Sequence, residues 1–182
     1  MTTTRDAEFA DYVAARLPSF RRLALLLTQD WHRADDVVQV AITKLYVHWG
    51  KAKAADSIDA YARAIVVREF LTERRSSWAR RVTLSGQVPE FAAPSFDRDG
   101  SLDLHNAIAA LPPRQCAVLV LRFYSDLTVE QSAEVLGCTP GTVKSQTAKA
   151  LDSLRRSLGP EFAPGAGSEP FAVRDRSSGE TS

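Results

Sequence analysis

The 182-residue sequence is poor in the residues that build metal, redox and disulfide sites. It has two cysteines and three histidines, and their positions do not form a metal-ligand spacing. We expect Cys116 and Cys138 to be small buried residues in a reducing compartment. The chain also lacks a Walker phosphate loop and a Rossmann glycine fingerprint. The sequence therefore predicts no metal, no cofactor and no catalytic site.

Long apolar runs and strand patterns are missing as well. No run of about 18 apolar residues predicts a membrane span, so we expect no membrane insertion. Arg5 and Asp6 are followed by polar and acidic residues instead of an apolar signal segment, which predicts a cytoplasmic protein. Alternation of apolar and polar residues is nowhere sustained, whereas helical spacing is frequent, so we expect an all-α fold.

Charge is nearly balanced overall but unevenly placed along the chain. The formal net charge is +1, so the whole molecule is not predicted to attract nucleic acid strongly. Residues 63–81 hold six arginines against two glutamates, and residues 139–158 hold four basic residues against one aspartate. Residues 85–106 hold four acidic residues against one arginine. Two basic regions are thus separated by an acidic one.

The chain divides into helical and irregular stretches. Asp30 is the predicted N-cap of a second helix that runs to Trp49, and Asp56 or Ser57 starts a third. Further helices are predicted from 101 to 110 and, opened by a proline, from 114 to 124. Glycines and prolines without periodicity predict a linker. We expect two helical domains joined by a flexible linker: residues 1–84, an acidic linker at 85–100, residues 101–158, and a disordered tail at 159–182.

The most informative stretch predicts a helix, a glycine turn and a second helix. Thr128 can cap the first helix, and Gln131 three residues later completes a capping box. Gly137 ends that helix where a left-handed residue is needed. Thr139 followed by Pro140 is a cap with a proline at the first helical position, which starts the second helix.

The second of these helices has two different faces. Val143, Ala150, Leu154 and Leu158 fall on one side. The other side carries small, polar and cationic residues: Gly141, Ser145, Ala148, Lys149 and Asp152, with Lys144 at its flank. Such a face can enter a DNA major groove, so the stretch predicts a DNA-binding helix-turn-helix. The alternative is a pair of surface helices on an all-α core, but caps, turn and face chemistry agree on DNA binding.

Three motifs in order carry a family resemblance. Residues 34–40 read Ala-Asp-Asp-Val-Val-Gln-Val, residues 111–115 read Leu-Pro-Pro-Arg-Gln, and residues 141–145 read Gly-Thr-Val-Lys-Ser. This order resembles bacterial sigma factors of the sigma-70 family, extracytoplasmic-function group. Residues 142–147, Thr-Val-Lys-Ser-Gln-Thr, together with Tyr61-Ala-Arg and Arg74-Arg75 upstream, are most similar to a sigma-E-like subgroup common in actinobacteria. Val40 replaces the family's usual glutamate, and Gln146 stands where arginine is frequent.

The resemblance implies two partners for the first domain. Residues of the second helix would dock on the coiled coil of the beta-prime clamp of core RNA polymerase: Asp35, Asp36, Val38 and Gln39. For Val38, packing inside the domain is the alternative. The third helix would meet the promoter −10 element through Tyr61, Arg68, Arg74 and Arg75. Tyr61 could stack on a splayed base or be a core tyrosine, and Arg68 stands where many relatives have asparagine.

The second domain is implied to read the promoter −35 element. Thr142, Lys144, Ser145 and Lys149 are the predicted contacts, because lysine can donate to guanine acceptors and serine can serve a base or a phosphate. Thr128 and Thr139 can help the amides at the two helix starts to hold phosphate.

The sequence thus predicts a transcription initiation factor rather than an enzyme. It would bind core RNA polymerase and promoter DNA, assist melting of the −10 region, and have an anti-sigma factor as a further candidate partner. Two alternatives remain open. One is a dimeric helix-turn-helix regulator that acts without core polymerase, and the other is a protein-interaction module that has lost DNA recognition.

Overall fold

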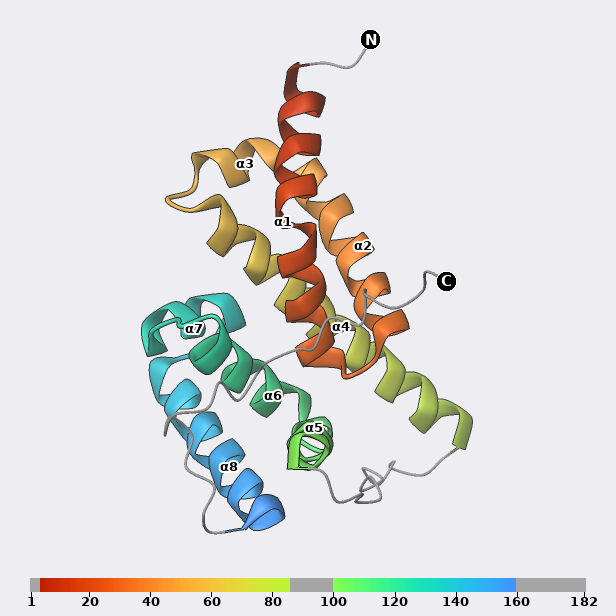
Figure 1. Ribbon diagram of the computed structural model, residues 1–182, viewed down its shortest axis with the longest axis vertical. Helices are drawn as coiled ribbons and strands as arrows, with labels where there is room; N and C mark the ends of the chain where they lie inside the picture. Colours follow the sequence, from red (N-terminus) through yellow and green to blue (C-terminus); the bar gives the residue numbers. More distant parts are fainter. Residues whose placement is uncertain (1–3, 86–99, 160–182) are drawn as a thin grey trace, which may run out of the picture.

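The computed structural model describes residues 4–85 and 100–159, and every regular element within these ranges is a helix. This confirms the predicted all-α fold. The N-terminal part, red to yellow-green in Figure 1, consists of α1 (Thr4–Thr28), α2 (Trp31–Val47), α3 (Trp49–Ala54) and α4 (Ile58–Ser85). Helices α1 and α2 lie side by side, and both pack against α4.

Helix α2 begins as predicted but ends earlier. The Asp30 carboxylate accepts the Arg33 amide at 2.9 Å, which confirms the N-cap. The predicted continuation to Trp49 is wrong, because His48 leaves helical geometry at φ −100° and ψ 17° and α3 starts at Trp49. The Trp49 ring is buried and packs edge-on against Phe9, with ring centroids 5.2 Å apart. Burial of this large aromatic ring accounts for the change of direction.

Two ion pairs join α2 to α4. Arg33 meets Glu73 at 2.6 Å, and Lys44 meets Glu69 at 2.6 Å. Both pairs keep partial solvent exposure, so they orient the helices more than they stabilise them. At the start of α4 the Ser57 hydroxyl accepts the Ala60 amide at 3.2 Å, which agrees with the predicted beginning of the third main helix.

The C-terminal part is a second group of helices. It consists of α5 (Gly100–Ala109), α6 (Pro113–Leu119), the π-helical segment η1 (Val120–Tyr124), α7 (Val129–Leu136) and α8 (Pro140–Leu158). The predicted helix over 114–124 has the right extent, but its last five residues are π-helical. There the Ser125 amide donates to the Val120 carbonyl at 2.9 Å.

The helix-turn-helix has the local structure that the sequence predicts. Thr128 and Gln131 form both hydrogen bonds of the capping box. Gly137 ends α7 in the left-handed region at φ +61°, where a Cβ would be strained. The Thr139 hydroxyl accepts the Thr142 amide at 3.2 Å, and Pro140 opens α8. The angle between the two helices is therefore set by residues of the turn itself.

We expect Thr128→Ala to destabilise the helix-turn-helix by about 1 kcal/mol, because it leaves the Gln131 amide of α7 without its side-chain acceptor. Urea unfolding followed by circular dichroism measures this change. Thr43→Ala is the control, since the exposed Thr43 hydroxyl only adds a bond to the Gln39 carbonyl within α2. Equal losses for the two variants would contradict the capping role.

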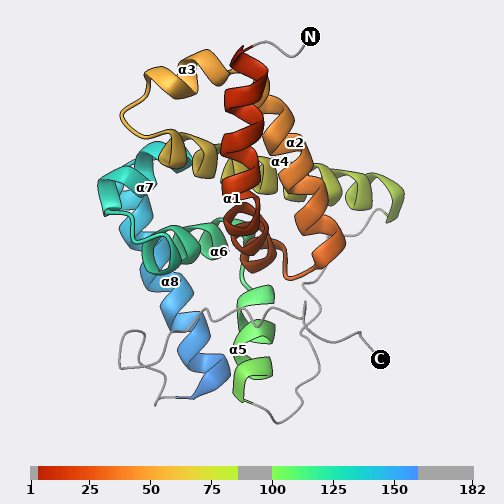
Figure 2. The same ribbon diagram turned by 45° about the horizontal axis from the view of Figure 1, so that its top comes forward.

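The two parts are packed against each other. Helices α6 and α7 contact α4, and α1 contacts α6 and η1. Figure 2 shows α7 and α6 lying along the N-terminal helices. Buried apolar side chains of both parts form one continuous cluster, which includes Phe70 of α4 and Leu121 of η1. The proposed linker and tail lie outside the described residues, except at their ends, so the domain limits stay predictions.

Candidate protein and nucleic-acid interfaces

Helix α8 presents the predicted contact residues on its outer face. Lys144, Ser145 and Lys149 are exposed, while Val143 and Ala150 on the opposite face are fully buried. Within the described ranges, neither lysine forms an ion pair or a side-chain hydrogen bond. Both ammonium groups are thus free to meet an anionic or acceptor-rich partner such as the edge of a base pair.

The threonines at the helix starts lie close to this face. Thr142 is partly buried, and its hydroxyl oxygen lies 3.0 Å from the hydroxyl oxygen of Thr139. Thr128 and Thr139 are both exposed, and each hydroxyl accepts one backbone amide. Capping uses an acceptor position of each hydroxyl, so the O–H donor of Thr128 can still bind a phosphate oxygen, whereas the Thr139 hydroxyl also shares a hydrogen bond with the Thr142 hydroxyl. The structure brings Thr139 and Thr142 together, with Thr128 at the start of the neighbouring helix.

The predicted DNA contacts on α4 are less uniform. Tyr61, Arg68 and Arg75 are seven residues apart and share one side of the helix. Tyr61 is partly buried and packs against the core, whereas Arg75 is exposed. Arg74 lies on a different side, where it lines a cavity of about 230 Å³ between α1, α4 and the start of α6. Four predicted contacts are therefore spread over two sides of one helix.

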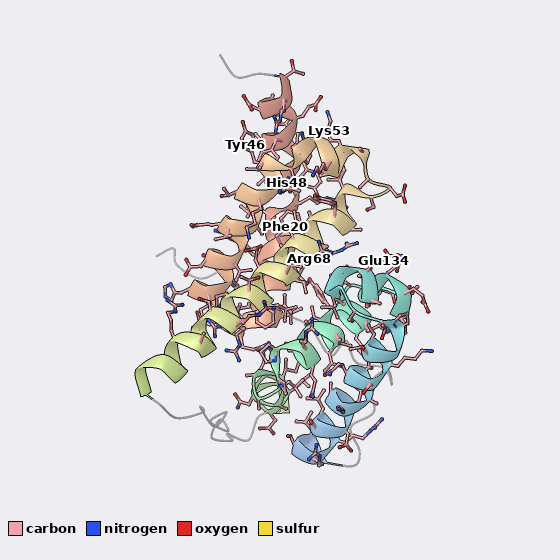
Figure 3. The ribbon with its side chains drawn as sticks, turned by 180° about the vertical axis from the view of Figure 1, so that it is seen from behind. Phe20, Tyr46, His48, Lys53, Arg68 and Glu134 are labelled. Carbon is pink, nitrogen blue, oxygen red and sulfur yellow. The ribbon has the colours of Figure 1, made fainter. Side chains whose placement is uncertain are left out.

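Arg68 already has partners in this structure. Its guanidinium donates to the carbonyl oxygens of Val135 at 2.9 Å and Glu134 at 3.2 Å, both at the end of α7. Figure 3 shows Arg68 on α4 facing the α7 turn that carries Glu134. In this arrangement the Arg68 side chain is occupied by the helix-turn-helix and cannot also bind a phosphate with the same donors.

The outer surface of α2 holds most of the predicted protein contacts. Asp36 and Gln39 are exposed, and in the described part of the molecule neither of their side chains forms a hydrogen bond or an ion pair. Asp35 is partly buried, and its carboxylate accepts a hydrogen bond from Arg21 of α1 at 2.9 Å. Of the two adjacent carboxylates, Asp35 is therefore paired and Asp36 is available to a partner. Val38 is only 2% exposed, and a direct contact of its side chain with a partner does not fit this structure. The packing alternative describes Val38 correctly.

The same surface contains two apolar residues that the sequence analysis did not assign to it. Val40 is 46% exposed and Val47 is 65% exposed. Together with Asp36, Gln39 and Thr43 they form one exposed stripe along α2, which we call the outer α2 surface. The spacing of residues 36, 40, 43 and 47, three or four apart, is the sequence pattern that places them on one face of α2. Val40 and Val47 offer apolar area to a protein partner where charged residues alone would not.

The cysteines and acidic residues form no metal centre in the described ranges, where no three His, Cys, Asp or Glu side chains gather. Cys116 is fully buried, as predicted, and burial raises the pKa of its thiol to about 12. Cys138 is only partly buried. No helix in the described part of the chain is both long and apolar enough to cross a membrane.

Comparison with known proteins agrees with the order of these features. Residues 12–80 match the family described as Sigma-70 region 2, and residues 101–154 match Sigma-70, region 4. The RNA polymerase sigma-E factor of Streptomyces coelicolor is 31% identical over 158 residues, covering 83% of this chain and 86% of the relative. The sigma factor SigV of Bacillus subtilis is 30% identical over 139 residues, covering 76% of this chain and 84% of the relative.

Two further similarities concern the group and the fold. The ECF RNA polymerase sigma factor SigM of Mycobacterium tuberculosis is 28% identical over 138 residues, covering 76% of this chain and 70% of the relative. Among solved structures, the sigma factor RpoE of Bartonella quintana, crystallised in complex with the anti-sigma factor NepR, has a similar fold. It superposes with a TM-score of 0.65 at 24% identity, over 83% of this chain and 96% of that chain.

Proposed function

This chain belongs to the sigma-70 family of RNA polymerase sigma factors, and we propose that it is an initiation factor of the extracytoplasmic-function group. We also propose which of its described residues contact each promoter element and core polymerase. The protein binds core RNA polymerase and directs it to promoters. The observation that carries the residue-level proposal is the α7–α8 unit, whose caps and glycine turn present an exposed, unpaired cationic face. That face suits a major groove.

The −35 element is assigned to α8. Lys144 and Lys149 would supply donors to base acceptors, and Ser145 lies between them on the exposed face. Thr139 and Thr142 stand at the helix start, where backbone amides and hydroxyls favour a phosphate. These contacts would position the helix and read bases with the first three turns of α8.

The −10 element is assigned to α4. Arg75 is exposed and carries no partner among the described residues, so it is an accessible phosphate contact on this helix. Tyr61 is partly buried, which leaves one part of its ring for stacking on an unpaired base. Arg68 and Arg74 would need to leave their present surroundings before they contacted DNA.

Core polymerase is assigned to the outer α2 surface. Asp36 and Gln39 supply the polar part, and Val40 and Val47 supply apolar area next to it. Asp35 contributes by fixing α2 against α1 through Arg21. We propose that this surface meets the coiled coil of the beta-prime clamp, and that Val40 replaces a polar contact of the family by an apolar one.

Three further points belong to this proposal. The protein would act in the cytoplasm, where its polymerase is, and it would perform no bond chemistry of its own. An anti-sigma factor is a candidate partner, because a protein of the same fold is known in complex with one. Such a partner would compete for the surfaces assigned to polymerase or DNA.

We expect the free protein to bind promoter duplex weakly and core polymerase to create specific binding. The net charge is +1, and each basic region offers few phosphate contacts on its own. Free binding should stay near the non-specific range of about 10⁻⁴–10⁻⁶ M at physiological salt. The complex with core enzyme should reach about 10⁻⁸ M or tighter on its own promoter. Gel shifts with a promoter library, with and without core enzyme, measure both values.

The alternatives give different gel-shift results. Tight, sequence-specific binding by the free chain that core enzyme does not change would indicate a conventional dimeric regulator. Association with core enzyme without selection of any DNA from the library would indicate a protein-interaction module. Either result would overturn the proposed promoter recognition.

A further inference from the structure

A single arginine makes the polar contact between the two parts of the molecule across α4 and α7. Arg68 Nε donates to the Val135 carbonyl at 2.9 Å, and one terminal nitrogen donates to the Glu134 carbonyl at 3.2 Å. The two acceptor carbonyls belong to consecutive residues, so the guanidinium binds the end of α7 through two hydrogen bonds. Figure 3 shows Arg68 on α4 beside the end of α7 that carries Glu134.

The electrostatics of α7 favour this contact. The last carbonyls of a helix have no partners inside the helix and carry the negative end of its dipole. A guanidinium there makes charge-assisted hydrogen bonds. A second arginine, Arg114, donates to the next carbonyl, that of Leu136, at 3.5 Å. Arg114 belongs to the C-terminal part itself, so among the described residues the side-chain hydrogen bonds from the N-terminal part to this helix end come from Arg68.

A second region of the boundary lies along α1 and α6. The buried Cys116 sulfur of α6 lies 3.8 Å from the carbonyl oxygens of Leu26 and Leu27, near the end of α1. A partly open hollow lined by Arg74, Phe70 and Cys116 itself lies beside this contact.

Promoter geometry requires the two parts to separate. By their names, the −10 and −35 elements are centred about 25 base pairs apart, which is about 85 Å of B-form DNA. In this structure α7 touches both Arg68 and α8. The predicted −10 helix and the −35 helix are thus within about two helix diameters, roughly 20–25 Å. The closed arrangement can reach one element, but not both at once.

We propose that Arg68 is a latch that holds the free protein in this closed form, and that it must leave the end of α7 before both promoter elements can be bound. This inference rests on the proposed function, because it is the spacing of the promoter elements that requires opening. The latch uses the same donors that a phosphate would use. Arg68 is accordingly released for DNA only when the two parts come apart.

Cys116 provides a probe of opening that needs neither DNA nor polymerase. Its thiol is buried at the boundary in the closed form, and the raised pKa of about 12 makes it unreactive there. In a Cys138→Ser background it is the only thiol of the chain. The rate of its reaction with a thiol reagent such as DTNB then reports how often the boundary opens.

We expect Arg68→Met in this background to raise the labelling rate of Cys116 about tenfold, the effect of losing two charge-assisted hydrogen bonds at a partly exposed site. Arg114→Gln is the matched control, because it removes an arginine from the same helix end without crossing the boundary. It should leave the rate within about twofold of the parent. Circular dichroism verifies that each variant keeps its helix content.

The outcomes are decisive in both directions. A faster rate for Arg68→Met with an unchanged rate for Arg114→Gln supports the latch. An unchanged rate for Arg68→Met, or equal acceleration by both variants, overturns it. If Arg68→Met loses helix content, Arg68→Lys decides, because it keeps the charge but loses the fork. An intermediate rate supports the latch, and the parent rate overturns it. Since no DNA is present, failure here leaves the proposed promoter function standing.

Discussion

The double substitution Asp36→Arg with Gln39→Ala is expected to abolish association with core RNA polymerase while leaving the fold intact. Asp36 and Gln39 are exposed on α2, and the residues that hold the helix in place face the other way, among them Val37 and Ala41 at 3% exposure each. Reversal of a charge at a complementary interface removes an attraction and adds a repulsion, often several kcal/mol together. At an exposed site outside an interface the change would stay below about 0.5 kcal/mol.

The structure shows why Asp36 is the better target of the two adjacent carboxylates. Asp35 is bonded to Arg21 of α1, so a substitution there would disturb helix packing and polymerase binding together. No side chain in the described part of the molecule bonds to Asp36, so its reversal leaves no buried partner unsatisfied. Loss of binding can then be attributed to the surface.

Pull-down with core enzyme measures this loss, and circular dichroism verifies the fold. Asp11→Arg serves as the control, because Asp11 is an exposed carboxylate that belongs to α1 and not to the outer α2 surface. Normal pull-down of the double variant would place the polymerase contact elsewhere on the protein. Equal loss for Asp11→Arg would mean that net charge alone governs association.

The apolar part of the outer α2 surface gives this prediction a second consequence. Val40 stands where the family usually has glutamate, and it is 46% exposed. An exposed valine next to Asp36 adds apolar area to the proposed contact, so binding should depend less on salt than a purely ionic contact would. The weaker salt dependence is expected of this chain and not of relatives that have glutamate at this position.

Local signals explain most of what the sequence predicted correctly. Asp30, Thr128 and Thr139 each satisfy an amide within three residues, so their capping roles follow from short-range chemistry. Gly137 ends α7 for a reason that is equally local, its left-handed backbone. The two faces of α8 also follow from sequence spacing alone, and burial in the structure confirms them: Val143, Ala150 and Leu154 inward, Ser145 and Lys149 outward.

The errors come from long-range packing. The break at His48 depends on the ring contacts of Trp49 with α1, about forty residues away in the chain, which periodicity cannot reveal. Val38 is buried because α2 packs on both α1 and α4, which widens its inward face. The partners of Arg68 are backbone carbonyls, a group that every residue carries, so no sequence pattern could predict them.

The proposed DNA contacts of α8 give the second large expected effect. Lys144→Ala with Lys149→Ala should reduce promoter use while leaving core binding intact. Each good base contact is worth about 1–3 kcal/mol, so loss of both would weaken promoter binding by about thirtyfold or more. Both lysine side chains lie on the exposed side of α8. The double substitution does not change Val143 and Leu154, which pack this helix against the core. Promoter binding and in vitro transcription with reconstituted holoenzyme measure the effect.

A matched control separates recognition from charge. Arg155→Ala with Arg156→Ala also removes two positive charges from α8, but from its last turn. There Arg156 pairs with Asp152 at 3.2 Å. If α8 enters the groove by its first turns, this control should weaken binding far less than the lysine pair does. It should also leave discrimination between promoters unchanged, because distant charge acts on all sequences alike. Equal effects of the two pairs would show that α8 supplies only charge, and loss of helix content in the lysine variant would make those lysines structural.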